Sequence, residues 1–189
     1  IALDSHREWN DTEKRALDIL DKWDYIMDRK SVAASIFDIM YIALGENLIK
    51  DDISAQLLQN IKEERKLIEY LILNITSDKT SSWIDDVNTP KKESFEDIVI
   101  RSFKETIRNL SDLRGEDFEE WEWGSIHTLT ISHPLGVIDL LEMTLNLNRG
   151  PFGMPGSYHT VCPYSYSFDN PFYADHGASH RHIYDPSDW

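Results

Sequence analysis

The chain has 189 residues, of which 41% are hydrophobic, so it is long enough to bury one sizeable core. Its formal net charge of −15 predicts repulsion from nucleic acid and from anionic membrane surfaces, and we expect neither as a partner. Because Asp38 and Glu69 interrupt the longest apolar stretches, no run of 18 apolar residues could form a membrane span.

The distribution of residue types divides the chain into two segments. Residues 1–120 hold most of the charged side chains and little glycine or proline, which is typical of helices with exposed faces. Residues 121–189 hold most of the proline, glycine and histidine, which is typical of strands and turns. We therefore expect an α+β fold, with a helical segment over 1–120 and a segment of antiparallel strands over 121–189.

Capping residues and apolar periodicity predict about four helices in the first segment. The expected capping residues, in chain order, are Asn10, Ser31, Ser54 and Ser94. Gly45 is expected to end the second helix and Gly115 the fourth. The third helix is expected to run without interruption from Ser54 to about Thr76, because its apolar rhythm is continuous over that range.

Three segments of the second part are expected to be strands. Residues 126–132 alternate apolar and polar side chains, and His133-Pro134 should end that strand. The other candidates, 158–166 and 173–184, are rich in aromatic residues. We expect these strands to pair with further sheet and, in isolation, to self-associate.

Two tryptophans and two histidines stand out where the segments meet. Trp121 and Trp123 precede a glycine, and the rings are expected to clamp the helices to a strand. His127 or His133 could be a general base, because imidazole titrates near neutral pH. We favour packing roles for both histidines, because no Ser or Cys lies in a nucleophile-elbow context.

Several short motifs occur in a distinctive order and spacing. They are Leu20-x-x-Trp23-Asp24, Ser31-x-Ala33-Ala34, Trp123-Gly124-x-x-His127, His133-Pro134-Leu135, Gly150-Pro151 and the run Gly177-Ala178-Ser179-His180-Arg181-His182-Ile183-Tyr184-Asp185. Together they resemble the carboxy-terminal third of the large chain in the penicillin acylase (penicillin amidase) family. The resemblance implies that this chain is part of a larger layered fold of the N-terminal-nucleophile hydrolases.

The resemblance also implies where the catalytic groups lie. In that family the nucleophile is a serine exposed by self-cleavage, its α-amino group is the base, and an Asn side chain with backbone amides forms the oxyanion hole. All of these groups would precede the matched region. Ile1 has no hydroxyl or thiol, and neither Ser125 nor Ser157 lies in the nucleophile's sequence context. We therefore expect no catalytic residue and no cofactor-binding residue here.

The function implied by the resemblance belongs to a parent enzyme. That enzyme would hydrolyse linear amides by acyl transfer from an N-acylated substrate, such as a penicillin or an N-acyl lactone, and this chain would be its non-catalytic carboxy-terminal part. The expected partners are the remainder of the parent chain and, bound by the parent, a small acylated amide. The alternative is a stand-alone helical module that binds a protein partner. An upstream reading frame with a serine nucleophile and an oxyanion-hole asparagine would favour the acylase.

Two further groups of residues permit a functional interpretation. His176, His180 and His182, with Asp175 or Asp185, could provide a tetrahedral zinc site. We expect no metal there, because histidines at strand spacing are a weak zinc signature. A strand whose polar face is rich in histidine explains the same pattern. The acidic pairs are expected to be solvated charges. These pairs are Asp51-Asp52, Asp85-Asp86 and Glu119-Glu120.

Overall fold

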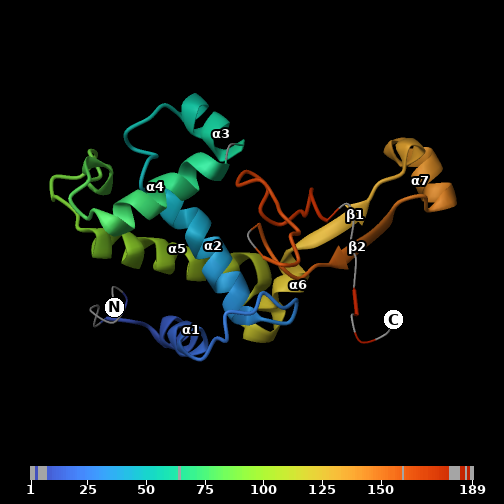
Figure 1. Ribbon diagram of the computed structural model, residues 1–189, viewed down its shortest axis with the longest axis horizontal. Helices are drawn as coiled ribbons and strands as arrows, with labels where there is room; N and C mark the ends of the chain where they lie inside the picture. Colours follow the sequence, from blue (N-terminus) through green and yellow to red (C-terminus); the bar gives the residue numbers. More distant parts are fainter. Residues whose placement is uncertain are drawn as a thin grey trace.

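The computed structural model describes residues 3, 8–63, 65–158, 160–178, 184–185 and 187 (Figure 1). Its helices are α1 Asp11–Asp21, α2 Val32–Asn47, α3 Ala55–Glu63, α4 Arg65–Ser77, α5 Phe95–Arg114, α6 Trp123–Ile126 and α7 Asp139–Leu145, and its strands are β1 Thr128–Ile131 and β2 Arg149–Gly153. Short 3-10 turns lie at Ser82–Ile84, Phe118–Trp121 and Pro134–Val137. The predicted α+β class is confirmed. Among the described helices, none is both long and apolar enough to cross a bilayer.

The predicted helix starts are correct because local hydrogen bonds determine them. The Asn10 side chain accepts a hydrogen bond from the Glu13 amide at 2.8 Å, and the Glu13 carboxylate accepts one from the Asn10 amide at 2.9 Å. Ser94 and Asp97 form the same reciprocal cap at the start of α5. Gly115 follows α5 with φ of 79°, a conformation that favours glycine.

The prediction that Gly45 ends the second helix is wrong. Helix α2 continues to Asn47, and Gly45 lies inside it. A Cβ atom on Gly45 would lie 2.2 Å from Cγ2 of Ile68 in α4. The glycine therefore permits the close crossing of α2 and α4, which sequence cannot reveal before the helices are placed.

The prediction of one uninterrupted helix from Ser54 to Thr76 is also wrong. Helices α3 and α4 run in different directions (Figure 1). Ile68, Ile72 and Ile75 of α4 are buried, whereas α3 has no buried residue. The apolar rhythm continues through both helices, so periodicity alone does not show the change of direction.

The core lies on both sides of α2. One cluster joins α2, α4 and α5 to aromatic residues from the second part of the chain, including Trp123 and Phe168. The other joins α2 and α5 to α1 and includes Phe103 and Trp121. Helix α2 is thus the central element. Its sequence is mostly apolar, as expected for a helix that is buried on several faces.

Beyond α6, a hairpin projects from the helical body (Figure 1). Strand β1 lies within the predicted range 126–132, although Ile126 belongs to α6. Its antiparallel partner is β2, with Thr128 opposite Gly153 and Leu129 opposite Phe152. Neither β2 nor α7, which lies between the two strands, was predicted.

The strand predictions for 158–166 and 173–184 are wrong for the residues that the structure describes. Only isolated bridges occur there, between Thr128 and Tyr173 and between Ser165 and His176. Residues 159, 179–183, 186, 188 and 189 lie outside the described part. Tyr166 and Phe168 turn into the helical core instead, where they are 3% and 1% exposed. The division into segments 1–120 and 121–189 stays a prediction.

Candidate functional site

The junction between the helices and the hairpin is built around Trp121 and Trp123. Both rings are fully buried, on opposite sides of the junction. Trp121 Nε1 donates to the Gly115 carbonyl at 2.9 Å, which joins it to the end of α5. Trp123 Nε1 donates to the Gly156 carbonyl at 2.8 Å, which joins it to the segment after β2. The rings therefore fasten the helices to the second part of the chain, although Trp123 reaches a loop and not a strand.

His127 lies against Trp123 with its ring fully buried. The two ring centroids are 4.6 Å apart at an interplanar angle of 15°, and the Tyr166 ring meets His127 edge-on. His127 Nε2 lies 3.1 Å from the Tyr164 carbonyl, which requires this nitrogen to carry the proton. Nδ1 has no partner of ordinary hydrogen-bond geometry among the described residues.

Burial determines the protonation state of His127. Loss of solvent lowers its pKa from 6.5 to about 4, although the carbonyls of Tyr164 and Pro171 act in the opposite direction. The ring is therefore neutral at pH 7. His127 is 0% exposed, so no substrate reaches its basic nitrogen Nδ1, and the lowered pKa makes it a weak base. This environment fits the favoured packing role and not that of a general base.

His133 plays a different local role and does not join His127. It is exposed, and its Nδ1 accepts a hydrogen bond from the Leu135 amide at 3.1 Å at the start of the Pro134–Val137 turn. Strand β1 separates the two histidines along the chain. The structure thus does not bring them together as a catalytic pair.

A buried carboxylate in α2 forms a network that sequence analysis missed. Asp38 is 3% exposed and accepts hydrogen bonds from the Tyr166 hydroxyl and, at 3.1 Å, from Ser157 Oγ. It also borders a hollow of about 230 Å³ next to Glu69 and Tyr41. The available signal was a charged residue in the middle of a mostly apolar helix, because such a charge needs buried partners. The network ties α2 to the loops after β2.

Replacing Tyr166 by phenylalanine should therefore lower the free energy of unfolding by about 2 kcal/mol. The hydroxyl donates to a buried carboxylate, and its loss leaves that charge with one partner fewer. The matched control is Tyr173→Phe, which removes a 3.0 Å bond to the neutral Thr130 carbonyl and should cost about 1 kcal/mol. Urea denaturation at pH 7 measures both. Equal losses would contradict a structural role for the Asp38 charge.

Two acidic pairs come together instead of standing separately in solvent. Asp86 Oδ2 accepts a hydrogen bond from Arg101 Nη1 at 2.7 Å, and this bond lowers the pKa of Asp86. Asp51 accepts a bond from the Val87 amide at 2.9 Å. Burial, and then the charges of Asp51 and the 85–86 pair, raise the pKa of Asp52. The prediction of solvated charges holds for Asp52, Glu119 and Glu120, which are exposed, whereas Asp51, Asp85 and Asp86 are half-buried.

The proposed zinc ligands are only partly described. His180 and His182 lie outside the described residues. His176 contributes its backbone carbonyl to a 3.0 Å bond from the Ser165 amide, and Asp185 accepts bonds from Ser187 that lower its pKa. The described residues contain no group of three or more His, Cys, Asp or Glu side chains arranged to hold a metal.

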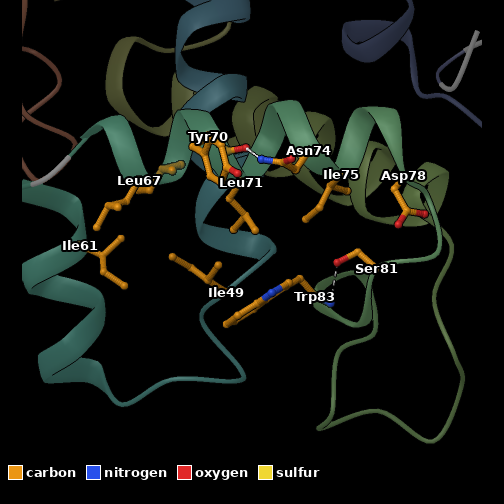
Figure 2. A pocket seen from close by; sticks show the side chains of 11 residues that line it. Ile49, Ile61, Leu67, Tyr70, Leu71, Asn74, Ile75, Asp78, Ser81 and Trp83 are labelled. Atoms are coloured by element: carbon orange, nitrogen blue, oxygen red, sulfur yellow. Dashed lines mark hydrogen bonds between the residues drawn. The ribbon is translucent and has the colours of Figure 1, made fainter.

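A large apolar hollow lies between α4, the end of α2 and the Ser82–Ile84 turn (Figure 2). Its volume is about 510 Å³. Figure 2 shows the Trp83 ring reaching toward Ile49 beneath Leu71, with Asp78 and Ser81 at one end. Such a lining can hold an apolar group. The described residues of its lining include no histidine, cysteine or lysine, and their one serine, Ser81, caps the Ser82–Ile84 turn by accepting a hydrogen bond from the Trp83 amide.

Comparisons with known proteins agree on one group of enzymes. The family model described as Penicillin amidase matches residues 2–189. A stretch of 47 residues is 40% identical to the acyl-homoserine lactone acylase QuiP of Pseudomonas syringae pv. syringae (strain B728a). That stretch is 25% of this chain and 6% of the relative, so the match spans only a small part of the relative's length.

Proposed function

Because the chain belongs to the penicillin amidase family, whose members are acylases, we propose that it is a non-catalytic, carboxy-terminal part of an enzyme that hydrolyses linear amides. The family match over residues 2–189 supports the acylase part of this proposal, and the surroundings of the candidate catalytic side chains support the non-catalytic part. The parent would transfer an acyl group from an N-acylated substrate to water. Similarity to an acyl-homoserine lactone acylase supports an N-acylated small molecule as the substrate class.

The bonds made by the candidate catalytic side chains support a structural role. His127 is neutral, buried and bonded to the Tyr164 carbonyl. Ser157 donates to Asp38, and the single hydroxyl hydrogen of Ser125 lies between the Glu120 and Glu122 carbonyls, both within hydrogen-bond distance of Oγ. A nucleophilic serine needs both a base within hydrogen-bond reach and an open approach for substrate. Among the described residues, Ser125 Oγ meets only carbonyl groups, and Ser157, although bonded to the Asp38 carboxylate, is only 5% exposed. The reacting groups would therefore come from the remainder of the parent.

We expect this chain alone to show no hydrolysis of N-acyl-homoserine lactones or of phenylacetyl p-nitroanilide. The parent enzyme should hydrolyse at least one of these amides under the same conditions. Chromogenic and mass-spectrometric assays measure both. Turnover by this chain that survives repurification and disappears in the His127→Gln variant would contradict the proposal, because it would place the base within these residues.

A further inference from the structure

Most of the large apolar side chains of the hairpin are exposed. We call residues 128–153 the arm; it comprises β1, the Pro134–Val137 turn, α7 and β2 (Figure 1). None of its residues is buried. Its exposed large apolar side chains are Ile131, Leu135, Val137, Ile138, Leu140, Met143, Leu145 and Phe152. A hairpin with its apolar side chains in water gains little stability from them, so this surface is suited to a partner.

Polar contacts, and not apolar packing, hold the tip of the arm together. Glu142 Oε2 accepts hydrogen bonds from the Leu147 and Asn148 amides, each at 3.0 Å. Asn148 Oδ1 accepts a bond from the His133 amide at 2.8 Å. The polar groups thus lie inside the tip while apolar side chains such as Met143, which is 86% exposed, face outward. In an ordinary solvated hairpin tip the polar side chains face the solvent and the apolar ones are covered, so the arrangement here is reversed.

The chemistry of the arm restricts the kind of partner. It contains three charged residues, Asp139, Glu142 and Arg149. Two of them are bonded within the arm, because Arg149 Nη1 donates to the Asn146 and Asn148 carbonyls. The outer surface therefore suits an apolar partner. The expected self-association of the isolated chain stays a prediction, and a second copy is the weaker candidate for this surface because each copy carries a net charge of −15.

We propose that the arm is the surface on which this chain docks against the remainder of its parent acylase. The proposal rests on the proposed function. The stretch shared with the related acylase covers 6% of that enzyme, so the relative holds ample chain beyond it to provide such a partner. In the described part the sheet has two strands, so β2 is an edge that a strand of the parent can extend.

Hydrogen exchange on the intact parent and on this chain alone tests the docking. Amides of residues 128–153 should exchange at least about tenfold more slowly in the parent, while those of α2 and α5 differ little. Equal exchange of the arm in both proteins would overturn the proposal. This holds also if the arm is protected in both proteins, because a second copy or the chain itself would then cover it in the isolated chain.

Two substitutions and a control separate docking from general destabilisation. Leu140→Asp and Met143→Asp change side chains that are 73% and 86% exposed, and Val161→Asp changes one that is 100% exposed outside the arm. In this chain alone, all three should leave the melting temperature unchanged. In the parent, only the two arm variants should bring exchange of the arm to within about twofold of the isolated chain. Protection that survives both arm variants would overturn the proposal.

Amide hydrolysis by the parent is assayed separately, so the two proposals can fail independently. A parent that hydrolyses N-acyl amides but leaves the arm unprotected refutes the docking alone. A parent that protects the arm but hydrolyses no amide refutes the proposed function and leaves the contact established.

Discussion

Replacing Trp123 by alanine should lower the free energy of unfolding by about 3–5 kcal/mol. The ring is 1% exposed and belongs to the cluster that joins α2, α4 and α5. Its removal leaves a cavity, exposes one face of His127 and leaves the Gly156 carbonyl without its 2.8 Å bond. Urea denaturation at pH 7, monitored by circular dichroism, measures the loss.

The matched control for Trp123 is Trp83→Ala. Trp83 is 37% exposed and lies at the edge of the apolar hollow shown in Figure 2. Its loss removes less buried surface and should cost about 1–2 kcal/mol. If the two variants were equally stable, the junction would not depend on Trp123, and the assignment of that ring as the link between helices and hairpin would be wrong.

Acidification should destabilise the protein by about 3 kcal/mol through His127 alone. The folded pKa is about 4 and the ordinary value is 6.5. Between these two values the unfolded chain binds a proton that the folded chain excludes, so stability falls as the pH falls from 6.5 to 4 and then levels off. The carboxylates with lowered pKa values, such as Asp97, lose their contributions at lower pH.

The His127→Gln variant tests this origin of acid sensitivity. Glutamine does not titrate, so the variant should lose much less stability between pH 7 and pH 4 than the original protein. His133→Gln is the matched control, because His133 is exposed, and it should retain the original pH dependence. Urea denaturation at several pH values gives the slopes. An unchanged slope in His127→Gln would show that other groups determine the acid response.

Local signals predicted the parts of the fold that local interactions determine. The helix starts at Asn10 and Ser94 follow from capping bonds within four residues, and Gly115 ends α5 with a positive φ. The Trp-x-Trp run was correctly placed at a junction, because large rings favour burial and each indole N–H finds a carbonyl partner there. The family resemblance, which rests on short motifs in order, is confirmed by the match over residues 2–189.

The features that sequence analysis missed depend on contacts between distant parts of the chain. Gly45 permits a helix crossing that exists only once α4 is in place. Strand β2 contains Gly150-Pro151, which favours a turn in any local interpretation. The aromatic residues of 158–166 suit either a strand or a core, and Tyr166 reaches Asp38 across 128 positions of sequence. Asp38 itself was noticed only as an interruption of an apolar stretch.

The central claim is that this chain completes an acylase without supplying its reacting groups. Complementation tests it most directly: the parent polypeptide without this region and the 189-residue chain are expressed separately and together, and hydrolysis of N-acyl amides is measured. The account predicts activity only when both parts are present, with each part inactive alone. Full activity of the parent without this chain, or activity of this chain alone, would contradict it.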